Sequence, residues 1–277
     1  MVSFNFFKMV KSFRSRNWKR NFSEDQSCAV AGFKGQVGSA IYRIIKEARM
    51  EVYGIEKDFS ETPLDRVDFL HICIPFDKKK DFIRAVSKLV RKSNPRNIII
   101  HSTVLPGITR AVWLKTGLPT AYSPIRGQHD SLYRDIKRYI KYLSPLPSSS
   151  SDIFKSHLEN LGLKVFSYNK APEELELVKI LDVCQYAISI GWAQEAERIL
   201  RNFSFDFYHL YKDFQAEHVK FYPEKRADIF PGFAGGHCVR QNARLLDRIY
   251  KSDFIKAFLK SNSLKAKELG IEDEESS

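Results

Sequence analysis

The sequence predicts an α/β fold in which a parallel-sheet domain is followed by an all-helical second domain. From about residue 26 to residue 170, short apolar runs alternate with amphipathic stretches, which is typical of a parallel sheet covered by helices. From Leu175 to Leu200 apolar residues recur at helical intervals, and no strand candidate follows before a glycine-rich segment at 231–239. A chain of 277 residues is long enough for two domains of ordinary size.

Each expected strand is a short apolar run that ends at a polar, glycine or proline residue. We expect strands at 28–32, 51–55, 69–74, 97–101, 118–122 and 164–168, and helices at 39–48, 79–91 and 152–161. Residues 144–151 have the Pro- and Ser-rich composition of an interdomain linker. We interpret them as a surface loop, because the helix and strand that follow continue the same alternating pattern.

The domain boundaries follow from these elements. We expect a basic, flexible tail at 1–25, the sheet domain at 26–170, a helical dimerisation and substrate domain at 171–262, and a charged, disordered tail at 263–277. The first tail carries six cations before its first acidic residue, Glu24, and several aromatic residues. Contact with an anionic membrane surface is one interpretation of this tail. The others are a partly disordered extension and a helix packed on a neighbour.

Composition excludes several classes of protein. No apolar run approaches the roughly 20 residues that span a bilayer, so we expect a soluble protein. The net charge is +12, but no aromatic-basic motif indicates nucleic-acid binding. The four cysteines lie far apart, without a CxxC pair or a histidine spacing that suits zinc. We therefore expect reduced thiols, a cytoplasmic location and no metal site.

A glycine-rich turn between the first strand and the first helix indicates a Rossmann-type dinucleotide site. Its residues are Gly32, Phe33, Lys34, Gly35, Gln36, Val37 and Gly38, a GxxGxxG spacing in which the usual GxGxxG has gained one residue. Glu56 ends the second strand, 18 residues after Gly38, where a carboxylate accepts hydrogen bonds from a ribose diol. It repels a 2′-phosphate, which favours NAD, although Lys57 leaves room for NADP. Ile74 and Pro75, which end the third strand, complete the expected cofactor site with Thr103.

The segment 231–239 places Cys238 behind a loop rich in glycine. Such a loop lets backbone amides and a ligand approach closely, so the thiol is a candidate nucleophile. The alternative is that Cys238 begins a helix and packs as a small apolar group.

The order of five features along the chain resembles the UDP-glucose/GDP-mannose dehydrogenase family. These features are the glycine turn, Glu56, residues 101–107 (HSTVLPG), the helix with Lys179 and the Gly-Gly-His-Cys segment. The resemblance covers about residues 28–260. It implies an NAD domain, a homodimer through the long helix from about Leu175, and oxidation of the C6 alcohol of a nucleotide sugar to a carboxylate through a cysteine thioester. Cys238 matches the nucleophile, Lys179 the lysine that stabilises an oxyanion, and Thr103 the threonine near the cofactor and the hydrolytic water.

Several positions depart from the family pattern. Val183 stands where the family has an asparagine one turn after the lysine, and Gln241 and Asn242 replace Lys and Asp after the cysteine. Ile125 follows Ser123-Pro124 in place of a glutamate, so the hydrolysis of the thioester is the step most in doubt. Asn242 could orient water but could not take its proton. The family's third domain has no expected counterpart in this sequence.

Local substitutes for the lost polar groups are available. Arg126 and His129 follow the altered Ser-Pro and are candidates for substrate binding together with Gly235 and Gly236, while His237 is a candidate base. A surface charge and a capping imidazole are the alternative roles. Three functions remain open: a nucleotide-sugar dehydrogenase, a two-electron hydroxyacid-type dehydrogenase that uses Lys179 as acid-base, and a non-catalytic NAD-binding module.

Overall fold

The computed structural model describes residues 26–57, 66–221, 231–235 and 239–271. Within them, one sheet has the strand order β2-β1-β3-β4-β5-β6-β7. The strands are β1 (Ser27–Ala31), β2 (Glu51–Ile55), β3 (Phe69–Ile72), β4 (Asn97–Ile100), β5 (Thr120–Tyr122), β6 (Lys141–Leu146) and β7 (Val165–Ser167). All neighbouring pairs are parallel except β5 and β6. The predicted fold class is therefore confirmed as a Rossmann-like sheet.

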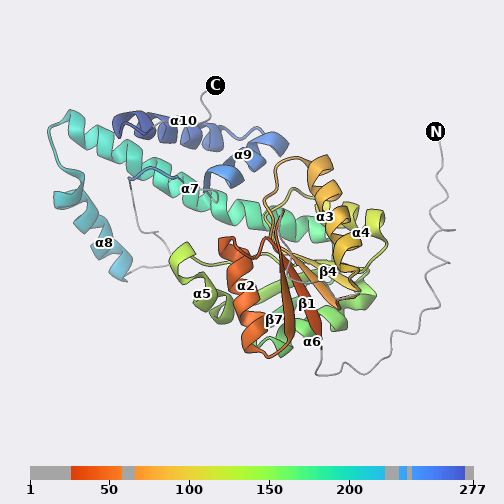
Figure 1. The fold of residues 1–277 in the computed structure, drawn as a ribbon. Helices are drawn as coiled ribbons and strands as arrows, with labels where there is room; N and C mark the ends of the chain where they lie inside the picture. Colours follow the sequence, from red (N-terminus) through yellow and green to blue (C-terminus); the bar gives the residue numbers. More distant parts are fainter. Residues whose placement is uncertain (1–25, 58–65, 222–230, 236–238, 272–277) are drawn as a thin grey trace, which may run out of the picture.

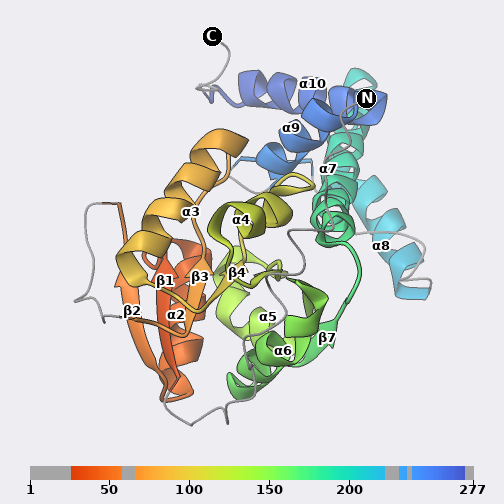
Figure 2. The same ribbon diagram turned by 90° about the vertical axis from the view of Figure 1, so that its right-hand side faces the viewer.

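Helices cover both faces of this sheet (Figures 1 and 2). One face lies under α2 (Gln36–Glu47), α5 (Leu132–Arg138) and α6 (Ser151–Asn160). The other lies under α3 (Lys79–Ser93), α4 (Ile108–Thr116) and the start of α7 (Pro172–Asn202). Apolar side chains alternate along the central strands between the two resulting cores, which is why each strand reads as a continuous buried run.

The second part of the described chain is helical. The long α7 crosses the molecule, and α9 (Val239–Ile249) and α10 (Asp253–Glu268) pack along it, while a π-helical turn (Phe207–Tyr211) and α8 (Lys212–Phe221) follow its far end (Figure 1). Gly191 lets α10 approach α7 closely, because a Cβ there would lie 3.3 Å from the ring of Phe258. The core between these helices is continuous with the core under α3 and α4, so the helical part and the sheet are packed as one body.

Some predicted elements need correction. Residues 144–146 are not a surface loop, because they form the second half of β6 and Ser144 and Leu146 are buried. The first half of β6 pairs with β7 and the second half with β5, so Pro145 has a neighbouring strand on only one side. A proline is tolerated at such an edge, but in the sequence it hides the strand.

The expected disordered tail at 263–277 is also wrong for residues 263–268, which continue α10. Its charged residues are used in the fold: Lys265 is buried and pairs with Glu197 and Glu268. The remaining expected strands occur, although β3 ends at Ile72 and α2 begins three residues earlier than predicted. The basic segment at 1–25 lies outside the described residues. In the part of the chain that the structure describes, every helix is too short or too polar to cross a membrane.

Candidate functional site

The glycine turn after β1 has the backbone that its sequence predicts. Gly32 has φ of +81°, and a Cβ there would lie 2.7 Å from the carbonyl oxygen of Cys73. A Cβ on Gly38 would lie only 1.9 Å from the carbonyl oxygen of Gly32, so α2 packs directly on the turn. Gly35 caps α2 without a side-chain hydrogen bond. The first-turn amides of the helix are therefore free of a side-chain cap, and helix N-termini of this kind bind phosphate.

Glu56 lies beside this turn. Its Oε1 accepts a hydrogen bond of 2.7 Å from the backbone N–H of Lys34, so the carboxylate is fixed next to the glycine residues. Phe33 folds back over β2, where only Gly54 leaves room, because a Cβ at Gly54 would lie 2.6 Å from the Phe33 ring. The predicted cofactor residues 32–38 and Glu56 are thus brought together.

The turns after β3 and β4 lie at the same edge of the sheet. Ser102 Oγ donates a 2.6 Å hydrogen bond to the carbonyl oxygen of Ile74, which joins the two turns. Ile74 and Thr103 are half-buried and Pro75 is exposed. Parallel strands place ligands at their carboxyl ends, so these three residues are placed where a dinucleotide binds in such folds.

A buried glutamate joins α7 to this edge. Both carboxylate oxygens of Glu176 accept hydrogen bonds, one from the backbone N–H of Gly107 at 2.6 Å and the other from the N–H and Oγ1 of Thr109 at 2.8 and 2.6 Å. Gly107 and Thr109 stand at the start of α4, so Glu176 caps that helix from another part of the chain. Burial raises the pKa of Glu176 to about 7, although these hydrogen bonds act in the opposite direction.

Lys179 lies three residues after Glu176 on α7 and is half-buried. Lys179 interacts electrostatically with Lys141, which is buried beside the turn after β5. Burial is the main reason that the pKa of Lys141 lies well below its usual range; the nearby Cys73 acts against this shift, and Lys179 adds to it. Lys141 Nζ donates to the carbonyl oxygens of Ser123 and Pro124 at 2.6 and 2.7 Å, so this lysine holds the turn.

The positions that depart from the family pattern are used for packing. Ile125 is buried in the apolar core under α2, α5 and α6. Gln241 on α9 donates a 2.7 Å hydrogen bond to the carbonyl oxygen of Phe76, just after β3. Asn242 is buried and Val183 half-buried. Ile125 and Gln241 thus make contacts between segments at positions where the family has a carboxylate and a lysine.

The segment before the candidate nucleophile is anchored from α7 and α10. Oδ1 of Asn262 accepts a 2.9 Å hydrogen bond from the Ala234 N–H. Gln194 Nε2 donates to that same Oδ1 at 3.1 Å and to the Gly232 carbonyl oxygen at 2.8 Å. Gly235 is exposed at the end of this segment. Gly236, His237 and Cys238 lie outside the described residues.

The structure describes only some of the predicted substrate residues. Arg126 is exposed and its guanidinium lies 5.1 Å from the ring centroid of Tyr139. The side chain of His129 lies outside the described residues. Sequence reasoning missed Glu176, Lys141, Gln194 and Asn262. No sequence signal could have found them, because each is a single polar residue whose partners are far away in the chain.

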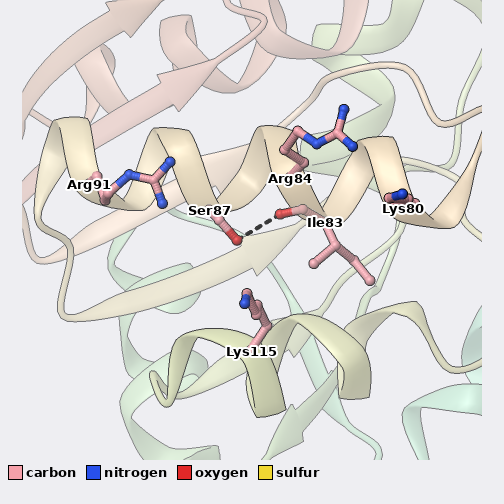
Figure 3. A pocket seen from close by; sticks show the side chains of 6 residues that line it. All are labelled: Lys80, Ile83, Arg84, Ser87, Arg91 and Lys115. Atoms are coloured by element: carbon pink, nitrogen blue, oxygen red, sulfur yellow. Dashed lines mark hydrogen bonds between the residues drawn. The ribbon is translucent and has the colours of Figure 1, made fainter.

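A basic hollow lies between α3 and α4, apart from the candidate site (Figure 3). It is lined by Lys80, Ile83, Arg84, Ser87, Arg91 and Lys115. None of the predicted site residues contributes to it, and within the hollow Ser87 Oγ is engaged with the Ile83 carbonyl oxygen at 2.8 Å. We therefore place the candidate site at the carboxyl edge of the sheet and not in this hollow.

Comparison with known proteins supports the fold. No protein-family model matches the sequence, and a search of curated proteins gives no match. Among solved structures, UDP-D-ManNAc dehydrogenase from Pyrococcus horikoshii aligns with a TM-score of 0.69 and 16% identity over 89% of this chain and 73% of its own. UDP-glucose dehydrogenase from Pyrobaculum islandicum gives 0.66 and 17% over 91% and 73%. The 3-hydroxyisobutyrate dehydrogenase of Mycobacterium tuberculosis gives 0.62 and 13% over 89% and 94%.

These alignments show the class of fold, which is that of dehydrogenases with a Rossmann-like sheet and a helical second part. More narrowly, the fold is nucleotide-sugar-dehydrogenase-like, as the resemblance in the sequence predicts.

Proposed function

We propose that this protein is an NAD-dependent dehydrogenase that oxidises the primary alcohol of a nucleotide sugar or a related sugar. The proposal depends on one observation: the glycine turn with Glu56 and the helix that bears Lys179 lie at the same edge of the sheet. The glycine turn with Glu56 stands at the ends of β1 and β2, and Glu176 attaches the helix that bears Lys179 to the same edge at α4. A dinucleotide cradle beside a lysine-bearing helix can place a hydride acceptor and a cation on either side of an alcohol.

The residues of this chain divide the chemistry between them. The amides of residues 32–38 and Glu56 hold NAD, which, when bound, supplies the hydride acceptor. Lys179 stabilises the negative charge that develops on the alcohol oxygen as its proton leaves. The Cys238 thiolate adds to the aldehyde carbon to give a thiohemiacetal, and that carbon then passes a hydride to a second bound NAD to leave a thioester. Water near Thr103 then opens the thioester to the carboxylate and the free thiol.

Hydrolysis of the thioester depends on a base that this chain replaces. Ile125 fills the position of a family glutamate with apolar packing, and Gln241 uses its amide to hold Phe76. Neither can take a proton from water. His237 is the proposed substitute because an imidazole titrates near neutral pH.

The same changes favour a second candidate function. A two-electron dehydrogenase needs Lys179 but neither a thioester nor a base for its hydrolysis. The likeness to 3-hydroxyisobutyrate dehydrogenase covers 94% of that protein, which supports this candidate. It would leave Cys238 as part of the pocket lining.

Stoichiometry distinguishes the candidates. The test is to incubate the protein and NAD with UDP-glucose, UDP-N-acetylmannosamine, GDP-mannose or 3-hydroxyisobutyrate and to measure NADH and acid product together. Two NADH per acid, with turnover abolished in Cys238→Ala, supports the proposal. One NADH per substrate with an active Cys238→Ala supports the second candidate. NAD binding without reduction of NAD by any of these substrates indicates a binding module.

Cys184→Ala is the matched control. Cys184 is buried on α7 and packs in the core, so its loss tests the general effect of removing a thiol. We expect it to retain the stoichiometry of the unaltered protein.

We also propose that α7 forms a homodimer, as the sequence analysis expects. Apolar side chains spaced at helical intervals along α7 are exposed, among them Leu181, Ile188, Trp192 and Ile199. A stripe of this kind is typical of an interface. Light scattering after size-exclusion chromatography should give a molar mass twice that of one chain. For Trp192→Glu we expect the mass of a single chain. A single-chain mass for the unaltered protein would exclude the dimer.

A further inference from the structure

Three side chains of types that bind metal ions lie together inside the sheet domain, on the face covered by α6. Cys28 on β1 and His71 on β3 share this face, because Cys28 lies opposite Phe69 and Val30 opposite His71. His157 reaches them from α6, and its ring stacks on Phe69 with the centroids 3.7 Å apart. The Sγ of Cys28 and a ring nitrogen of each histidine all lie within 4.8 Å of one another. All three residues are fully buried.

The outer ring nitrogens are held by hydrogen-bond partners. Nδ1 of His157 lies 2.8 Å from the amide oxygen of Gln26. Nδ1 of His71 lies 3.0 Å from Nε2 of His101, whose Nδ1 lies 2.7 Å from the Ser123 carbonyl oxygen. Metal-bound histidines are held in this way, since a partner for one ring nitrogen directs the lone pair of the other toward the ion.

The two remaining nitrogens, Nε2 of His71 and Nε2 of His157, face each other at 3.1 Å. Four contacts run from the Gln26 oxygen through three imidazoles to the Ser123 carbonyl, and both of these oxygens are acceptors. Lys141 Nζ also lies 3.3 Å from Nδ1 of His101. Each of the four contacts needs one hydrogen, whereas three neutral imidazoles carry three in all. When the outer nitrogens keep their hydrogens, the two Nε2 lone pairs converge next to the Cys28 sulfur with nothing between them.

We propose that Cys28, His71 and His157 form a structural site for a thiolate-preferring metal ion, Zn²⁺ or Cu⁺. The thiolate and two imidazoles supply three ligands, which suit Cu⁺ and leave one position of a tetrahedral Zn²⁺ for a further ligand, whereas Mg²⁺ and Ca²⁺ take oxygen ligands. Binding forms one metal–sulfur and two metal–nitrogen bonds and releases the thiol proton of Cys28 to solvent. The metal ion joins β1, β3 and α6, and it lies within the sheet face, before the glycine turn that begins at Gly32.

The sequence predicts no metal site, because its cysteines and histidines do not have the spacing of a local metal-binding motif. Cys28 and His71 are 43 positions apart, and His71 and His157 are 86 apart, so no local motif announces them. The parallel register of β1 and β3 and the crossing of α6 bring them together.

Metal content tests the proposal directly. The full chain, purified without chelator, should hold one ion per chain by mass spectrometry of the metals, and the zinc and copper signals identify which ion it is. Protein stripped with a chelator should take up Co²⁺ and show the charge-transfer absorption of a Co²⁺–thiolate bond. Melting temperature should rise by several degrees when Zn²⁺ or Cu⁺ is returned.

Two variants assign the ligands. Cys28→Ser should lose the thiolate absorption and the rise in melting temperature, while Cys184→Ser, with a buried thiol elsewhere, should keep both. Circular dichroism checks that each variant is folded. If Cys28→Ser does not fold, Cys28→Ala takes its place: it also removes the thiolate and should lose both the absorption and the rise in melting temperature.

Other outcomes would overturn the proposal. A folded chain without bound metal, without the Co²⁺ absorption and without a rise in melting temperature would mean that the histidines share a proton or that the Gln26 amide is turned to donate to His157. An absorption that survives in Cys28→Ser would mean that the metal binds elsewhere.

Discussion

Replacing Glu176 with glutamine tests how the helical part is attached to the sheet. The glutamate is fully buried and accepts hydrogen bonds from Gly107 and Thr109. Glutamine has the same size but only one oxygen. If that oxygen serves Thr109, the amide NH₂ faces the Gly107 N–H, and two donors oppose each other. A buried donor without an acceptor costs about 1–3 kcal/mol, so we expect a loss of about 2 kcal/mol while the glutamate is protonated.

The sign of the pH dependence follows from the raised pKa. The folded protein has a Glu176 pKa of about 7 against an ordinary value of 4.5, so the folded state binds more protons than the unfolded state between these values. The free energy of unfolding of the unaltered protein therefore falls as pH rises through this window. Linkage gives a fall of about 2.5 kcal/mol from about pH 5 to about pH 8, which Glu176→Gln lacks. The two proteins should differ in stability by about 2 kcal/mol near pH 5 and by about zero near pH 8.

Urea denaturation followed by circular dichroism at several pH values measures this difference. Buried His71, whose pKa burial lowers to about 3 from 6.5, destabilises both proteins as pH falls below 6.5, and this effect cancels in the difference. Glu173→Gln is the control on the same helix. The pKa of Glu173 is lowered by Arg110, so it stays ionised in both states across the range, and its half-exposed ion pair is worth about 0–1 kcal/mol at every pH. A Glu176→Gln cost that grows with pH would refute the reasoning.

Three further predictions concern the proposed site. Gly38→Ala places a methyl group 1.9 Å from the Gly32 carbonyl oxygen, so we expect a loss of stability of about 1–3 kcal/mol and of NAD affinity, measured by urea denaturation and by calorimetry. Glu56→Ser removes the charge that repels a 2′-phosphate, and should raise the ratio of NADP to NAD affinity about tenfold in the same calorimetric assay. Asn262→Ala frees the N–H of Ala234, and should lower kcat of the proposed oxidation more than it raises KM, whereas Asn262→Asp, which keeps the acceptor, should restore much of it.

The sequence predicts the sheet well because local signals determine most of it. Buried parallel strands read as short apolar runs, and the turn at Gly32 and Gly38 needs glycine for steric reasons that any chain must obey. The prediction fails where the secondary structure of a segment depends on the elements that pack against it. β6 contains Pro145 and becomes a strand only because β5 and β7 each pair with half of it. The last residues of α10 are charged but helical because Lys265 finds Glu197 on α7.

The candidate site follows the same rule. Residues in the glycine turn could be predicted because the close packing of the turn and α2 requires glycine at a fixed spacing. Glu176, Gln194 and Gln241 could not, since each acts on a partner 67, 38 or 165 positions away. Their positions become meaningful only when the topology is known.

These long-range polar contacts also decide what a mutation outside the sheet edge would do. Gln194 on α7 and Asn262 on α10 share one hydrogen bond and together hold residues 232 and 234, which lead directly to Gly235. Any shift of α10 along α7 is therefore transmitted to the segment that precedes Cys238. Residues 232–234 are consequently held by helices rather than by the sheet, whereas the glycine turn at Gly32 is held by β1 and α2. The proposed oxidation requires these two segments to keep their relative position. The carboxylate of Glu176, buried between α4 and α7, is the polar contact best placed to maintain it.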